Sequence, residues 1–125
     1  MNTKIYELTD FPSLFEKLKS QKLTFKTSYR LTLLAKEIEK HVTFYQESFR
    51  NLIMEYSKKD ENGNPIPTDD GQGVKLAEET MTEAYQRLSE LQDLDAELPD
   101  YKFSPDDFGD IELTPLEMSV LLPFI

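Results

Sequence analysis

Apolar residues recur at steps of three or four between about residues 26 and 58, and this spacing predicts one long amphipathic helix. The stripe comprises Leu31, Leu34, Ile38, Val42, Tyr45, Phe49, Leu52 and Tyr56. No Gly or Pro interrupts the segment, and Thr27 or Ser28 can cap its start. Because these side chains share one face of the helix, we expect Phe49 to be buried with the others.

A second helix is predicted from about residue 77 to residue 94. Its apolar stripe comprises Met81, Ala84, Tyr85, Leu88, Leu91 and Leu94. Glu78 and Glu79 lie in its first turn, where the positive end of the helix dipole stabilises them. Neither helix can bury its stripe alone, so we predict an antiparallel hairpin of unequal arms, with Leu88 and Leu91 packed on the longer helix.

The connector between the two helices, residues 58–76, is rich in turn-forming residues. Asn-Gly at residues 62–63 and Asp-Gly at residues 70–71 are strong turn signals, and residues 66–68 can pair with residues 73–75 in a small exposed β-hairpin. A connection this long between two helices often carries function. Because its residues favour exposed turns, we expect the connector to protrude.

Shorter elements are predicted on both flanks. Asp10 can cap a short helix, and alternation over residues 94–98 and 101–103 is typical of half-buried strands. Thr114, followed by Pro and then Glu117, forms a capping box that starts a last helix. The predicted fold is mainly α (α+β with minor β): a long and a shorter helix in an antiparallel hairpin, an exposed turn-rich connector, short flanking strands and terminal helices. We expect residues 1–125 to form a single α-rich domain.

Composition narrows the class of protein. The chain has 125 residues, of which 38% are hydrophobic, with eight Phe and six Tyr, so we expect a folded domain. The absence of Cys excludes a disulfide framework, a thiolate metal site and a Cys nucleophile. The N-terminal segment lacks the pattern of a signal peptide, and the longest apolar run is too short to span a bilayer. We expect a cytoplasmic protein without a membrane partner.

Charge is divided unevenly along the chain. Residues 1–58 carry ten Lys/Arg and seven Asp/Glu, whereas residues 59–125 carry four and seventeen. This asymmetry indicates an acidic surface that meets a partner. Lys22, Lys26 and Arg30 form the densest basic stripe, which could grip a phosphate backbone or an acidic partner. Pairing with the chain's own acidic half is the favoured interpretation, so no direct nucleic-acid binding is expected.

The connector contains part of a calcium-loop pattern. Asp60, Asn62 and Asn64 stand at positions where a calcium loop supplies oxygen ligands. Pro65 then replaces the Gly that the loop needs, and Gly71 replaces the bidentate Glu that would close the site. An acidic turn-rich loop without a metal is therefore the favoured interpretation.

No residue pattern supports catalysis. His41 stands four residues after Glu37, and two ligands are too few for an isolated metal site, so a surface pair is favoured. Adjacent carboxylates that could act as acid/base pairs are Asp69/Asp70, Glu78/Glu79 and Asp106/Asp107. With twenty-four carboxylates in the chain, such doublets arise by chance. We predict no catalytic, cofactor-binding or metal-binding residue and no enzymatic activity.

The acidic C-terminal half is the predicted interaction surface. Seven of its acids fall between residues 93 and 110, and aromatic residues among them could supply desolvated contact area. The predicted contributors are Asp93, Asp95, Glu97, Asp100, Asp106 and Asp107, with Tyr101 as the aromatic anchor. The alternative is a solvated face that only keeps the protein soluble.

Six segments spread over nearly the whole chain carry a resemblance. They are QKLTFKTSYRL (21–31), FYQESFRNLI (44–53), KKDENGNP (58–65), TDDGQGVKL (68–76), LQDLDAELPDYKFS (91–104) and GDIELTPLEMSVLLPFI (109–125). In this order they resemble a family of small acidic bacteriophage proteins of unknown function from phages of gut and lactic-acid bacteria. The Glu-Asn-Gly turn and the TPLEM…PFI ending are the most specific parts. The resemblance implies a phage origin and a single α-rich domain, and it implies no catalytic residue.

Two functional hypotheses remain. The favoured one is a non-enzymatic virion or assembly protein that acts through protein–protein contacts with a phage structural protein or a host protein. The alternative is a small acidic phage inhibitor that occupies the nucleic-acid groove of a host defence or transcription protein. Both place the chain in the host cytoplasm during infection, and the first also places it in the virion. A homo-oligomer is left open.

Overall fold

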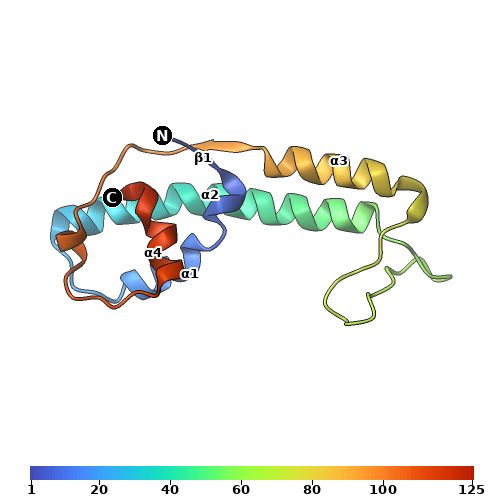
Figure 1. Ribbon diagram of the computed structural model, residues 1–125, viewed down its shortest axis with the longest axis horizontal. Coiled ribbons are helices and arrows are strands. Elements are labelled where there is room, and N and C mark those ends of the chain that lie inside the picture. Colours follow the sequence, from blue (N-terminus) through green and yellow to red (C-terminus); the bar gives the residue numbers. More distant parts are fainter. The chain divides into compact units, whose positions relative to one another are not determined.

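The structure is a computed structural model that describes residues 1–125. Four α-helices alternate with short 3-10 turns, and two short strands form one antiparallel sheet (Figure 1). The helices are α1 (Phe11–Leu18), α2 (Phe25–Glu55), α3 (Met81–Gln92) and α4 (Pro115–Leu121), and the strands are β1 (Asn2–Lys4) and β2 (Asp95–Glu97). The predicted class, mainly α with minor β and built on one long helix, is confirmed. No helix is both long enough and apolar enough to cross a membrane.

The chain divides into two compact units. Unit 1 comprises Met1–Thr43 and Asp95–Ile125, and unit 2 comprises Phe44–Leu94. Two packing units can belong to one domain. The single domain over residues 1–125 therefore stays a prediction.

Unit 1 packs on the first half of α2. The most deeply buried side chains of that half, each at most 3% exposed, are Leu31, Leu34, Ile38 and Val42. Helix α1 packs on α4, and the Phe11 ring meets the Phe124 ring edge-on with centroids 5.8 Å apart. The stripe predicted for the long helix is therefore buried over this half.

The start of α2 differs from the prediction. Thr24 caps the helix, because its Oγ1 accepts a hydrogen bond from the Thr27 N–H at 3.3 Å, and its carbonyl accepts from the Ser28 N–H at 2.9 Å. Thr27 and Ser28, predicted as caps, already lie inside the helix. The Asp10 side chain makes no capping hydrogen bond at the start of α1 either.

The capping box that begins α4 is confirmed. Thr114 Oγ1 accepts from the Glu117 N–H at 3.2 Å, and Glu117 Oε1 accepts from the Thr114 N–H at 2.9 Å. Glu117 also lies 3.1 Å from the Lys17 Nζ of α1. One side chain thus closes the first turn of α4 and ties it to α1.

Only one of the two predicted C-terminal strands forms. Strand β2 lies within the predicted range 94–98 and pairs with β1, with Ala96 opposite Thr3. Residues 101–103 form no strand. Instead, the Phe103 N–H donates to the Phe124 carbonyl at 2.6 Å, and the Phe103 ring packs on Phe108. A strand forms only where a neighbouring strand pairs with it through backbone hydrogen bonds. Strand β1 is paired with β2 over Asp95–Glu97, so residues 101–103 have no strand beside them.

Unit 2 contains the predicted helical hairpin. Leu52 of α2 and Tyr56, which directly follows α2, form a buried cluster with Ala84 of α3, and Leu76 and Leu88 pack against it. The Tyr56 hydroxyl donates to Glu83 Oε1 at 2.7 Å. An ion pair between Arg87 and Glu55, 3.0 Å apart, also joins the helices. Burial of Leu91 completes the predicted contact side of α3.

Three aromatic or aliphatic residues predicted to face inward are exposed. Phe49, Tyr85 and Leu94 are 42%, 58% and 40% exposed. At 100° per residue, Phe49 lies roughly 60° round α2 from Leu52, on the side opposite Glu55, which pairs with α3. A single partner helix covers only part of the helix surface, so Phe49 faces the connector instead of the hairpin core.

Candidate functional site

The connector is an ordered element rather than a loose loop. Three antiparallel bridges join its extended segments in pairs: Ser57 with Leu76, Lys59 with Pro65, and Pro67 with Val74. The pairing predicted between residues 66–68 and 73–75 is confirmed, because the Thr68 N–H donates to the Gly73 carbonyl at 2.9 Å. The additional pairing with residues 57–59 ties the connector back to the end of α2.

Backbone hydrogen bonds close these three segments into a ring. The Lys58 N–H donates to the Lys75 carbonyl at 2.7 Å, and the Lys75 N–H to the Ile66 carbonyl at 2.8 Å. The Ile66 N–H completes the ring by donating to the Lys58 carbonyl at 2.9 Å. The two turns need Gly63 and Gly71, whose φ angles are +78° and +71°. The ring therefore holds the connector in a defined conformation beside α2.

An apolar groove runs between α2 and the connector. Its lining residues are Tyr45, Gln46, Phe49, Arg50, Ile53 and Met54 of α2, with Gln72, Gly73 and Val74 of the connector. The Tyr45 and Phe49 rings stack with centroids 6.4 Å apart. The groove therefore presents an aromatic pair and aliphatic side chains at an open surface.

Polar groups stand at the rim of the groove. Arg50 is exposed. Asp69 and Asp70 lie in the same turn as Gln72, which lines the groove. Hydrogen bonds from the Thr68 hydroxyl and the Gln72 N–H lower the pKa of Asp70, so this carboxylate remains charged at neutral pH.

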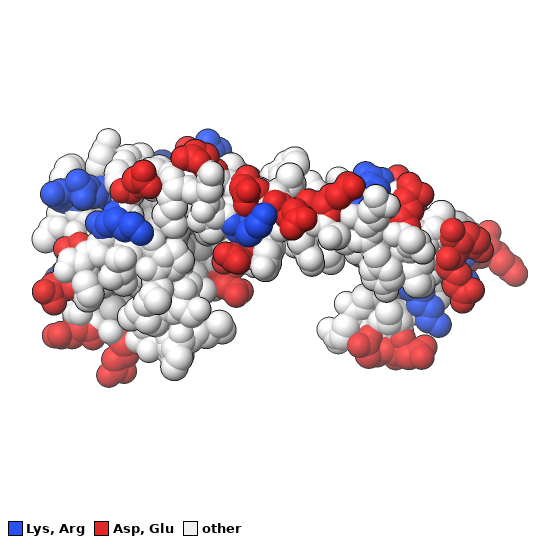
Figure 2. All heavy atoms as spheres, turned by 45° about the horizontal axis from the view of Figure 1, so that its top comes forward, with Lys and Arg blue, Asp and Glu red and all other residues white.

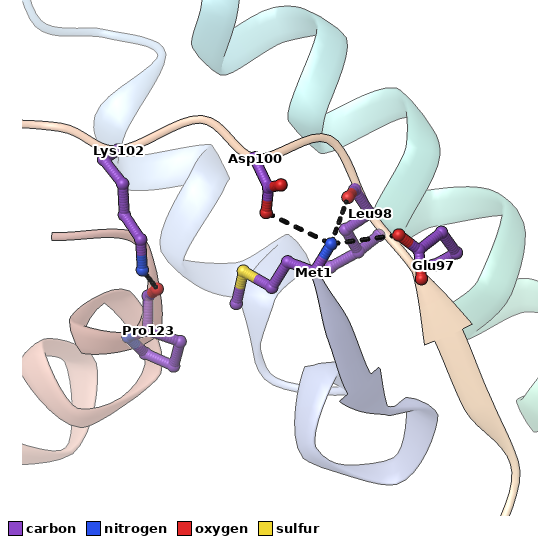
Figure 3. A network of polar contacts seen from close by, with 6 residues as sticks. All are labelled: Met1, Glu97, Leu98, Asp100, Lys102 and Pro123. Atoms are coloured by element: carbon purple, nitrogen blue, oxygen red, sulfur yellow. Dashed lines mark hydrogen bonds and ion pairs between the residues drawn. The ribbon is translucent and has the colours of Figure 1, made fainter.

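The predicted interaction residues of the C-terminal half are largely engaged within unit 1. The Met1 ammonium lies 3.1 Å from both Glu97 Oε1 and Asp100 Oδ1 and donates to the Leu98 carbonyl at 3.0 Å (Figure 3). The hydrogen bonds to Glu97 and then Asp100 raise the pKa of the Met1 amine. The Lys4 ammonium lies 3.3 Å from Asp95.

The remaining predicted residues are spread over other elements. Asp107 Oδ2 accepts from the Ser104 N–H at 2.8 Å and so caps the 3-10 turn Pro105–Phe108, which also contains the exposed Asp106. Tyr101 is half-buried beneath the Arg30 guanidinium, 5.7 Å from its ring centre. Asp93 directly follows α3, in unit 2. The structure thus brings Glu97 and Asp100 together around Met1, and the role of all seven residues in partner binding stays a prediction.

Sequence reasoning missed the groove because it assigned Phe49 and Tyr45 to the buried stripe. Leu33, Phe44 and Ile53 lie off this stripe, so the sequence does predict that the long helix contacts neighbours on more than one side, but it does not say which neighbour covers which side. The connector residues Gln72, Gly73 and Val74 carry no such signal, because only folding places them beside α2.

The candidate chemistry of single residues is weak. Glu37 pairs with Lys40 at 2.9 Å rather than with His41, so the expected Glu37–His41 pair is wrong. No group of three or more His, Cys, Asp or Glu residues is placed to hold a metal ion. No known protein family, curated protein or solved structure matches the chain. The resemblance to the phage family therefore stays a prediction.

Proposed function

We propose that this chain is a non-enzymatic bacteriophage protein that acts through protein–protein contacts as a virion or assembly component. The observation that carries the contact role is the apolar groove between α2 and the hydrogen-bonded connector. The phage context rests on the resemblance of six segments to small acidic phage proteins.

The groove has the anatomy of a protein-binding site. Large exposed aromatic side chains at the centre of a contact supply most of its binding free energy once a partner excludes water from them. Phe49 and Tyr45 are already stacked, so binding orders few additional side-chain rotations. On the opposite wall, Gly73 and Val74 are held by backbone pairing with Thr68 and Pro67.

Charge indicates a basic partner surface. Residues 44–94, which form unit 2, carry eleven Asp/Glu against five Lys/Arg. Asp and Glu side chains dominate around α3 and the connector, with few Lys or Arg side chains among them (Figure 2). Such a surface steers a basic patch of a partner toward the groove and repels acidic patches.

A photo-crosslinking residue in place of Phe49 tests the proposal. Crosslinks are formed during infection, and the crosslinked proteins are identified by mass spectrometry. They should join position 49 to a protein of the phage particle or of its assembly intermediates. The same residue in place of Tyr6, which is equally exposed but belongs to unit 1, is the matched control. Equal crosslinking from both positions, or none from Phe49, would contradict the proposal.

The inhibitor hypothesis has one observation in its favour. Glu83 and Glu90 are exposed along α3, and Glu79 is exposed in the 3-10 turn just before it. A row of carboxylates can occupy the Lys and Arg residues that otherwise receive phosphates. This function predicts crosslinks from position 90 to a host nucleic-acid-binding protein, which added DNA or RNA abolishes. It also predicts that purified particles lack the chain.

A further inference from the structure

An exposed pair of aromatic rings stands among cations at the start of α2. Phe25 and Tyr29 are 87% and 58% exposed, and their rings stack with centroids 6.4 Å apart. Lys22 and Lys26 are exposed beside them and make no ion pair. We call these four residues the cationic-aromatic face.

The cationic-aromatic face is not neutralised by the chain's own carboxylates, contrary to the sequence-based expectation. No Asp or Glu occurs from residue 17 to residue 36. Arg30, the third cation of the basic stripe, lies over the half-buried Tyr101 ring rather than against a carboxylate. Two water-exposed rings beside two unpaired cations therefore form a surface that a partner with apolar and anionic groups would complement.

The groove in unit 2 supplies those complementary groups. Its wall of Phe49, Ile53 and Val74 can receive apolar rings. Asp69, in the turn that leads to the lining residue Gln72, is fully exposed. Its nearest cation is the Lys75 ammonium, whose Nζ lies 3.7 Å from Asp69 Oδ1, a long distance for an ion pair. Arg50 also lines the groove, and its positive charge does not oppose binding of the face, because the guanidinium can stack on an incoming aromatic ring as a cation–π partner.

We propose that the occupant of the groove is the cationic-aromatic face of a second copy of this chain. This inference rests on the proposed function, because it names the partner of the same groove. The Phe25 and Tyr29 rings of one copy enter the groove of the next copy beside Phe49. The Lys22 and Lys26 side chains then face the turn that contains Asp69 and Asp70.

The proposed contact joins two different surfaces of the chain. Each copy can therefore bind one neighbour through its groove and another through its cationic-aromatic face. Copies linked in this way form a closed ring, of which a dimer is the smallest, or an open chain. Such an assembly is what a virion or assembly component requires.

The first experiment measures self-association of the full chain by sedimentation velocity over a wide concentration range. A face variant, Phe25→Ser with Lys26→Asp, and a groove variant, Phe49→Ser, should each sediment as a monomer. These side chains lie at exposed positions, so the variants should keep the parent's circular dichroism and lose little stability. Mixing the two variants should restore one functional contact and yield a dimer that grows no further.

A charge exchange tests the orientation. Lys26→Asp alone should weaken self-association at least about tenfold, because it sets like charges against each other. Combining it with Asp69→Lys in the same chain should restore the parent's affinity. Lys36→Asp, which makes the same charge change farther along α2, is the control and should leave self-association unaltered.

Three outcomes of the sedimentation experiment would overturn the inference. They are a parent that stays monomeric at all concentrations, face variants that associate like the parent, and a mixture that does not associate. Loss of oligo(dT) binding in Lys22→Asp/Lys26→Asp, with no self-association in the parent, would assign the face to single-stranded nucleic acid instead. A crosslink from Phe49 to a different particle protein would overturn the second copy as partner but leave the proposed function standing.

Discussion

Among single residues, burial separates the aromatic side chains that hold the fold from those that face outward. Phe11 and Phe124 are almost fully buried and contact each other, whereas Phe25 is the most exposed large apolar residue. Phe49 belongs to the second group although its position on α2 suggests the first. Substitutions should therefore affect stability at the former positions and association at the latter.

Leu52 and Phe49 provide a direct test within one helix. Leu52→Ala should lower the free energy of unfolding by about 2–5 kcal/mol, because it opens a cavity in the unit 2 cluster. Phe49→Ala should lower it by less, about 1 kcal/mol, because Phe49 is 42% exposed and lies outside the buried cluster. Urea denaturation of both variants measures the difference. If Phe49→Ala proved as destabilising as Leu52→Ala, the ring would be a core residue and the groove would not exist.

Glu117 gives unit 1 a specific pH dependence. The Thr114 N–H, and then the Lys17 ammonium, lower the pKa of this carboxylate from its ordinary value of 4.5. A lowered pKa in the folded state contributes stability above the ordinary value, and this contribution is lost as pH falls through the folded-state pKa. Glu117→Gln should therefore lower the melting temperature at neutral pH, and the difference from the parent should vanish in acid. Glu112→Gln, at an exposed position on the same segment, should show no such trend.

Among the elements, the connector shows how local turns and non-local pairing combine. Gly63 and Gly71 allow the two turns, while the ring of hydrogen bonds among Lys58, Ile66 and Lys75 joins residues far apart in the sequence. Helix α2 likewise combines a local and a non-local contribution. Its length follows from local preference, but its burial changes from unit 1 to unit 2 with the elements that pack on it.

The connector also carries the prediction on calcium. Asp60 Oδ1 already accepts from the Asn62 and Asn64 N–H groups, at 2.9 and 3.0 Å, so this carboxylate organises the turn. Calcium chloride should leave the melting temperature unchanged relative to the same ionic strength of sodium chloride, since only an ion that binds the folded state raises it. A calcium-specific rise that Asp60→Asn abolished would instead show a metal site.

In the molecule as a whole, the net charge of −10 should govern the rate of partner association. Asp-to-Asn and Glu-to-Gln changes at Asp95, Glu97, Asp106 and Asp107 together should lower the association rate for a basic partner. They should leave the dissociation rate unaltered if these acids act only by long-range steering. Surface plasmon resonance at low and high salt measures both rates, and screening should remove the difference between variant and parent.

Asp69→Asn at the groove rim is the matched comparison, and it should raise the dissociation rate as well. If the four-residue variant associates like the parent even at low salt, the C-terminal acids have no part in partner binding. Asp95 and Glu97 also contact Lys4 and Met1, so the stability of the variant needs to be measured alongside.

The sequence alone determined features that depend on neighbouring residues. The period of apolar residues placed α2 and α3 within a few residues, and the Thr114 capping box and the connector turns are encoded within a few positions. Even here, the cap moved from Thr27 or Ser28 to Thr24, because several hydroxyl residues near the helix start fit the same local pattern.

Only the tertiary structure decided features that join distant residues. The exposure of Phe49 depends on which side of α2 receives α3, and the groove depends on a connector that returns to the same helix. Likewise, Glu97 and Asp100 meet Met1 because β2 pairs with β1, a contact across nearly the whole chain. Periodicity states which residues share a face, but it does not state what covers that face, because coverage is set by packing between segments that are remote in the sequence.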